Sequence, residues 1–118
     1  MTQQSALEVV LAYQEAWTHQ DFAIAANYLA SEVVFDSQAQ YVTGVQAFMD
    51  ALTPFALRIV PGWQQIAAFG NDREAVLMYT VTTSGGAVVR AADYFMVQDG
   101  KIKLDKLVFA TEVADRAL

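Results

Sequence analysis

Residues 87–110 read AVVRAADYFMVQDGKIKLDKLVFA, two runs rich in β-branched and aromatic residues on either side of the turn signal Asp99-Gly100. Because so short a connection joins neighbouring antiparallel strands, this stretch predicts a long β-hairpin. Two earlier runs have the same composition and are also bounded by short glycine-containing segments. The second half of the chain therefore predicts an antiparallel meander of long strands, over 63–69, 75–83, 87–97 and 102–110.

The first half of the chain has the periodicity of helices. Apolar residues recur at steps of three and four, which is typical of amphipathic helices. The pattern predicts helices over 6–17, over 22–29, and from Thr43 or Gly44 to an end or kink at Pro54, with short strands at 33–36 and 41–42. Since no linker or repeat interrupts this order, we expect a single α+β domain over residues 1–118, with three N-terminal helices packed on a sheet.

Composition excludes several classes of protein. The chain has 118 residues, 55% hydrophobic and 17% charged, with a formal net charge of −6, no cysteine and a single histidine, His19. A disulfide framework and a metal site built from Cys and His are therefore excluded. The acidic charge disfavours nucleic acid and anionic membranes as partners. Without a basic-apolar leader or an apolar run of about 20 residues, we expect a soluble, cytoplasmic protein.

Apolar residues occupy both faces of the expected strand over 87–97. Successive side chains of a strand point to opposite faces, and a face exposed to water is normally polar. The helices can cover only one face of the sheet, so we expect a second copy to cover the other, in a homodimer formed through the sheets. The two faces carry Val89, Ala91, Asp93, Phe95 and Val97, and Arg90, Ala92, Tyr94 and Met96.

Three stretches resemble a known superfamily. They are Tyr13 and Trp17 followed by HQDF at 19–22, VVFD at 33–36 followed by Gly44, and AADYFMVQDGKI at 91–102. Together with the order of elements, they resemble the nuclear transport factor 2-like superfamily, and within it the SnoaL-like proteins and ketosteroid isomerase. The resemblance implies a cystatin-like cone of three helices on a curved antiparallel sheet. It also implies a cavity open at one end and, commonly, a dimer through the sheets.

The resemblance to ketosteroid isomerase implies three catalytic residues. Tyr13 matches the phenolic donor, Asp93 matches a neutral acid that donates a hydrogen bond, and Asp36 lies near the carboxylate base. Between Asp21 and Asp36 the chain is one residue shorter than the family, and Ser37 stands where a proline is usual. A slip of one residue would turn Asp36 to the opposite face of its strand.

The chemistry of these groups is consistent with proton transfer. Burial among apolar residues should raise the pKa of Asp93 and keep it protonated. Asp93 and Tyr13 would then stabilise an enolate oxygen while Asp36 moves a proton. No glycine-rich phosphate loop or nucleophile motif is present, so no cofactor is expected. The ligand expected in such a site is a small, mostly apolar molecule, held by Trp17, Phe48, Met49, Trp63 and Phe95.

Each candidate also has a purely structural interpretation. Tyr13 can be an aromatic residue at the edge of the core, Asp36 can bond the backbone of a turn, and Arg58 or Arg90 can pair with Asp93. Lys101, Lys103 and Lys106 with Asp105 resemble a solvated strand face.

Two functions follow from these alternatives. The first is a SnoaL-like protein that holds its ligand in a conical cavity, with acid–base chemistry of the isomerase or cyclase kind on a carbonyl compound. The second is a noncatalytic binding or dimerisation module. An open cavity onto which Tyr13 and Asp93 converge favours the first, and a cavity filled by Trp17, Phe48 or Phe95 favours the second.

Overall fold

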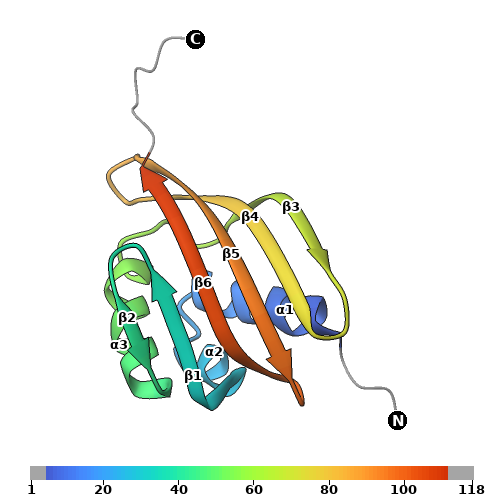
Figure 1. Cartoon of the computed structure of the whole chain (residues 1–118). Coiled ribbons are helices and arrows are strands. Elements are labelled where there is room, and N and C mark those ends of the chain that lie inside the picture. Colours follow the sequence, from blue (N-terminus) through green and yellow to red (C-terminus); the bar gives the residue numbers. More distant parts are fainter. Residues whose placement is uncertain (1–4, 112–118) are drawn as a thin grey trace.

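The computed structural model describes residues 5–111, with three helices lying against one face of a six-stranded sheet (Figure 1). None of the described helices has both the length and the apolar character to cross a membrane. The helices are α1 (Ala6–Thr18), α2 (Phe22–Asn27) and α3 (Val45–Ala56). The strands are β1 (Leu29–Ser37), β2 (Tyr41–Thr43), β3 (Gln64–Gly70), β4 (Glu74–Thr82), β5 (Val88–Gln98) and β6 (Lys101–Thr111).

Local sequence explains where the helices begin and end. Ser5 and Glu8 form a capping box, in which each side chain accepts a hydrogen bond from the other's backbone N–H, so α1 begins at Ala6. The helix α3 extends past Pro54 to Ala56, so the expected end or kink at Pro54 does not stop it. Leu29, which shares the apolar periodicity of α2, belongs instead to β1, because the backbone N–H of Ile102 in β6 bonds the carbonyl of Tyr28.

The sheet has the order β2-β1-β6-β5-β4-β3. The meander β3–β6 is antiparallel throughout, as predicted, and β2 is antiparallel to β1. The pair β1–β6 is parallel, so the sheet is mixed rather than wholly antiparallel. Parallel neighbours need a long connection, and here α3 and the meander separate β1 from β6 along the chain. Sequence patterns report strand positions but not which distant strands become neighbours.

One bulge in β6 decides which of its residues face the helices. Val97 pairs with Ile102, but the preceding Met96 pairs with Leu104, so Lys103 is an extra residue in the β5–β6 pairing. An extra residue reverses the alternation of faces beyond it. Ile102 and Asp105 are therefore both buried on the inner face, although they are three residues apart.

The inner and outer faces of the sheet differ in exposure. On the inner face, residues such as Leu77 and Phe95 are fully buried beneath the helices. On the outer face, large apolar side chains remain exposed in this single chain, up to 70% for Phe69. The others on the outer face of β4, β5 and β6 are Val76, Met78, Met96 and Val108.

Gly70 provides a test of how α1 packs at the start of β4. A Cβ added to Gly70 would lie 2.9 Å from the carbonyl oxygen of Glu74 and 3.0 Å from Cβ of Leu7 in α1. We expect Gly70→Ala to lower the free energy of unfolding by about 1–3 kcal/mol, since backbone must move to make room. Gly85→Ala, whose added Cβ meets only Thr83 Oγ1 at 3.9 Å, is the control. Equal melting temperatures for the two variants would contradict this packing.

Candidate functional site

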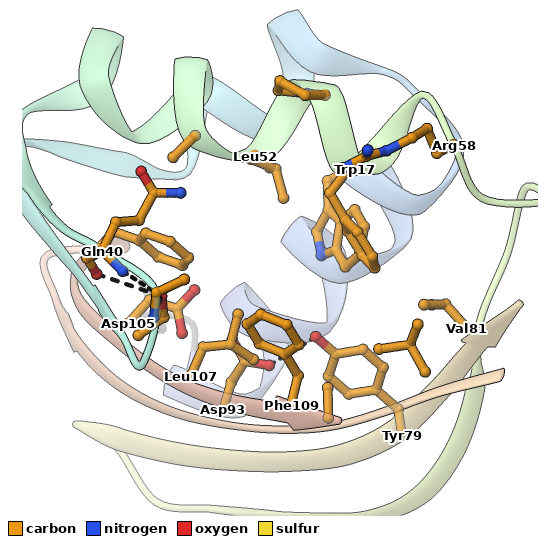
Figure 2. Close-up of a pocket in the computed structure, with 18 of the residues that line it drawn as sticks. Trp17, Gln40, Leu52, Arg58, Tyr79, Val81, Asp93, Asp105, Leu107 and Phe109 are labelled. Atoms are coloured by element: carbon orange, nitrogen blue, oxygen red, sulfur yellow. Dashed lines mark hydrogen bonds between the residues drawn. The ribbon is translucent and has the colours of Figure 1, made fainter. Parts of the chain in front are cut away.

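A cavity of about 390 Å³ lies between the helices and the inner face of the sheet (Figure 2). Most of its wall is apolar, including Trp17, Phe35, Phe55 and Val81. Its exposed members form the rim: Ala39, Gln40, Asp50, Pro54, Arg58 and Phe109. At the buried end the wall becomes polar, with Tyr13, Tyr79, Asp93 and Asp105.

Three of these polar residues come from adjacent strands. In the register of the sheet, Asp93 of β5 is opposite Leu77 and Leu107, two positions from Tyr79 in β4 and from Asp105 in β6. The side chains are therefore diagonal neighbours on one face. The Tyr79 hydroxyl donates a hydrogen bond of 2.7 Å to Oδ1 of Asp93. Asp93 is 4% exposed and Asp105 2% exposed, so both carboxyl groups are removed from water.

Burial raises the pKa of both carboxyl groups. Burial raises the pKa of Asp93, while hydrogen bonds from Asp105 and Tyr79 counteract part of that rise. The pKa of Asp105 is raised well above its usual value, first by burial, then by the charge of Asp93 and the hydrogen bond between the two groups. Two adjacent buried carboxylates cannot both ionise cheaply. After the pair loses its first proton, the second proton is therefore retained to higher pH.

Tyr13 is held at the same end of the cavity by aromatic contacts. Its ring lies 6.1 Å from the rings of Phe48 in α3 and Phe95 in β5, edge to face with both. Burial raises its pKa well above the usual value, and the charges of Asp105 and Asp93 raise it further. The hydroxyl therefore stays protonated and can donate a hydrogen bond. Tyr13 and Asp93, both predicted from sequence, do lie at one cavity.

Asp36 does not line the cavity with Tyr13 and Asp93. In the β1–β6 pairing Phe35 lies opposite Asp105 and Asp36 lies opposite Lys106. Phe35 and Ser37 line the cavity, so Asp36, between them in the strand, projects from the other face. The prediction of Asp36 as a base at the cavity is therefore corrected: its neighbours in the strand face inward, and a shift of one residue turns a side chain to the opposite face.

The five residues expected to hold a ligand lie in three different environments. Trp17 lines the cavity. Phe48 and Phe95 are fully buried in the core beneath it, where they pack on Tyr13. Met49 and Trp63 are partly buried against the core and, within residues 5–111, are not part of the cavity wall.

Asp105 and Tyr79 were missed from sequence. Asp105 is buried rather than part of a solvated face, because the bulge at Lys103 reverses the alternation along β6. The alternating run Asp105, Leu107, Phe109 was the available signal. Asp93 has Tyr79 and Asp105 as partners, not Arg58 or Arg90. Across residues 5–111, no cluster of three His, Cys, Asp or Glu forms that could bind a metal.

The raised pKa values predict how stability depends on pH. The unfolded chain releases these protons near pH 4, whereas the folded chain retains them to higher pH, so the free energy of unfolding falls as the pH rises above about 4. Because asparagine has no proton to release, replacing Asp105 with Asn removes its part of this loss of stability. We expect Asp105→Asn to gain at least about 1 kcal/mol relative to the native chain between pH 4 and pH 8, measured by urea unfolding. Asp36→Asn is the control. Parallel stability curves for Asp105→Asn and the native chain would contradict the raised pKa of Asp105.

Comparison with known proteins identifies the family. The profile of the SnoaL-like domain matches residues 10–104. A solved structure from Kribbella flavida is 34% identical, with a TM-score of 0.86, and covers 90% of this chain and 87% of that chain. A nuclear transport factor 2-like protein of unknown function from Cytophaga hutchinsonii is 17% identical, with a TM-score of 0.77 and coverage of 93% and 95%.

An LEH-like epoxide hydrolase from M. tuberculosis is 17% identical, with a TM-score of 0.75, covering 89% of this chain and 82% of that one. At 17% identity, the proteins from Cytophaga hutchinsonii and M. tuberculosis show only that the fold is shared. No curated protein matches this chain significantly. The match of the SnoaL-like profile and the 34% identical relative confirm the predicted resemblance: the chain belongs to the SnoaL-like domain family.

Proposed function

We propose that this protein binds a small, mostly apolar carbonyl compound in the cavity and catalyses acid–base chemistry of the isomerase kind upon it. The observation that carries the proposal is the pair of buried carboxyl groups, Asp93 and Asp105, with raised pKa values at the end of an apolar cavity. A carboxyl group with a raised pKa exchanges protons effectively near neutral pH.

The pair supplies an acid and a base together. Asp105 donates its proton to the carbonyl oxygen while Asp93 accepts a proton from the neighbouring carbon, which gives an enol. Return of a proton from Asp93 to a different carbon, with the enol proton returning to Asp105, completes an isomerisation. The pair holds one proton before and after each transfer, so no second buried negative charge is created. The Tyr13 hydroxyl is a second donor for the same oxygen.

Open space in the cavity supports this function over a noncatalytic binding module. Phe48 and Phe95 are packed in the core, and Trp17 forms part of the wall. Oδ1 of Asp105 is buried without a hydrogen-bond partner among the described residues. An unpartnered buried polar atom is costly, and a polar group of a ligand would satisfy it.

Deuterium exchange tests the chemistry without knowledge of the natural substrate. In D₂O, the protein should accelerate exchange at the carbon next to the carbonyl in some members of a panel of small cyclic and open-chain ketones, followed by NMR. Asp93→Asn and Asp105→Asn should each slow this exchange at least about 100-fold, because each removes one proton-transfer group. Asp36→Asn, on the other face of β1, should exchange at the native rate.

Binding is measured on the same panel by ligand-observed NMR. Ketones that bind without accelerated exchange would favour the noncatalytic module and overturn the catalytic proposal. Equal exchange by the native chain and the Asp93→Asn and Asp105→Asn variants would also overturn it, provided that all fold with the same circular dichroism.

We also propose that a second copy of this chain covers the outer face of the sheet. Val76, Met78, Met96 and Val108 are exposed there in a single chain, on the face opposite the helices. Exposed apolar patches of this kind are typical of interfaces between proteins.

Light scattering after size exclusion tests the dimer. We expect a mass near twice 13.0 kDa for the native chain, and a shift to monomer for the double variant Met78→Lys with Met96→Lys, because two buried charges would be unpaired in the interface. Leu57→Lys, an exposed apolar residue after α3, should stay dimeric. A native mass near that of one chain would end this proposal.

A further inference from the structure

Arg58 is the one basic side chain among the described residues that line the cavity. It lies at the exposed rim, just after α3, whereas Asp93 and Asp105 lie at the buried end. Figure 2 shows its side chain extending from the rim toward Trp17 rather than away from the cavity. The cavity therefore has a positive charge at its rim and two carboxyl groups at its buried end.

The backbone of Arg58 is held from two directions. Its N–H donates a hydrogen bond of 2.9 Å to the carbonyl of Phe55 in the last turn of α3. Its carbonyl accepts hydrogen bonds from the N–H of Ser84 at 2.7 Å and from the Ser84 hydroxyl at 2.9 Å. The next residue, Ile59, is buried and forms a β-bridge with Thr83. The fold thus fixes the point from which the arginine side chain extends, as a binding residue requires.

The guanidinium group has no protein partner in the described part of the chain. Among residues 5–111, neither an ion pair nor a hydrogen bond holds its nitrogens. Asp50, on the same rim, instead accepts a hydrogen bond of 2.8 Å from Gln46, one turn earlier in α3. A guanidinium presents five N–H donors in a planar fork that matches the two oxygens of a carboxylate. These donors are free to bind an anionic group of a ligand.

The sheet separates Arg58 from the carboxyl groups at the buried end. Asp93 lies opposite Leu77 in β4. Arg58 is bonded to Ser84, which lies past the end of β4 at Thr82. The strand between Leu77 and Thr82 advances five residues, or about 17 Å. A ligand that contacts both ends of the cavity must therefore be elongated, with its anionic group far from its reacting group.

We infer that the substrate is an elongated carbonyl compound that carries a carboxylate group, and that Arg58 binds this carboxylate at the rim. This inference deepens the proposed function and rests on it, because the carbonyl group is the part that reaches Asp93 and Asp105. The apolar wall between the two ends, which includes Trp17 and Val81, contacts the hydrocarbon part of the molecule.

The charge of the protein favours a carboxylate over a phosphate. The chain has a formal net charge of −6, and Asp50 lies on the same rim as Arg58. A carboxylate brings a single negative charge, which one bidentate arginine can pair. A phosphate monoester brings almost twice that charge near neutral pH, so the surrounding negative field repels it more strongly.

A series of oxo acids and their methyl esters tests the inference. In each compound an increasing number of methylene groups separates a ketone from the carboxylate, and dissociation constants are measured by calorimetry with the native chain. The longer acids should bind about 10-fold more tightly than their esters, because the ester lacks the charge that Arg58 pairs. Affinity of the acids should rise with length until the ketone reaches the buried end and then fall.

Substitutions of arginine separate a specific contact from the general field of the protein. Arg58→Gln should weaken binding of the acids about 10-fold and leave the esters unchanged. Arg58→Lys keeps the charge without the fork and should retain part of the preference for acids. Arg73→Gln is the matched control, since Arg73 is also exposed but does not line the cavity. It should bind acids and esters as the native chain does.

Three results would overturn the inference. The first is equal affinity of the native chain for acids and esters. The second is a loss of acid binding in Arg73→Gln as large as that in Arg58→Gln. The third is a loss in Arg58→Gln that is the same for acids and esters, which would indicate a steric role. Neutral ketones carry no carboxylate, so their deuterium exchange tests the proposed function separately. Selective binding of acids without exchange would uphold the role of Arg58 and refute only the catalysis.

Discussion

The pairing of β5 with β6, with one extra residue at Lys103, is the constraint on which the site depends. It places Asp105 on the inner face, diagonal to Asp93, and leaves Leu107 and Phe109 facing the cavity beside it. Without that bulge Asp105 would project outward with Lys101 and Lys103. The same strand pairs in parallel with β1, so the register of β6 also decides that Phe35 faces inward and Asp36 does not. One bulge thus brings Asp105 into the cavity beside Asp93.

Burial then raises the pKa values of Asp93 and Asp105. Two carboxyl groups removed from water retain a proton that the unfolded chain would release, so the fold is less stable at neutral pH than it would be with an amide in their place. Such a cost is typical of sites where side chains serve a function rather than the stability of the core. Hydrogen bonds to Asp93 from Asp105 and from Tyr79 counteract part of the rise in its pKa. The apolar wall of the cavity excludes water from the two carboxyl groups, which strengthens these hydrogen bonds.

Much of this was accessible from sequence. The alternation of Val89, Ala91, Asp93 and Phe95 placed Asp93 inside the sheet, and the helical periodicity placed Tyr13 and Trp17 beneath it. The prediction for Asp36 was wrong because face assignment in a strand depends on register, and one residue reverses it. Asp105 was missed for the same reason. Phe48 and Phe95 were predicted as ligand contacts, but aromatic residues on one face of an element can pack in the core or line a cavity, and only the packing distinguishes these.

The sequence by itself determined the elements and the family. Periodicity and turn signals are local properties, so three helices, the meander and the SnoaL-like resemblance were contained in the order of residues. Tertiary structure alone decided the parallel pairing of β1 with β6, the face on which each residue of β6 lies after the bulge, and the hydrogen bond from Tyr79 to Asp93. These depend on which distant segments become neighbours. Contacts between α1, β4, β5 and β6 join residues that no local pattern relates, and the properties of the acids follow from those contacts.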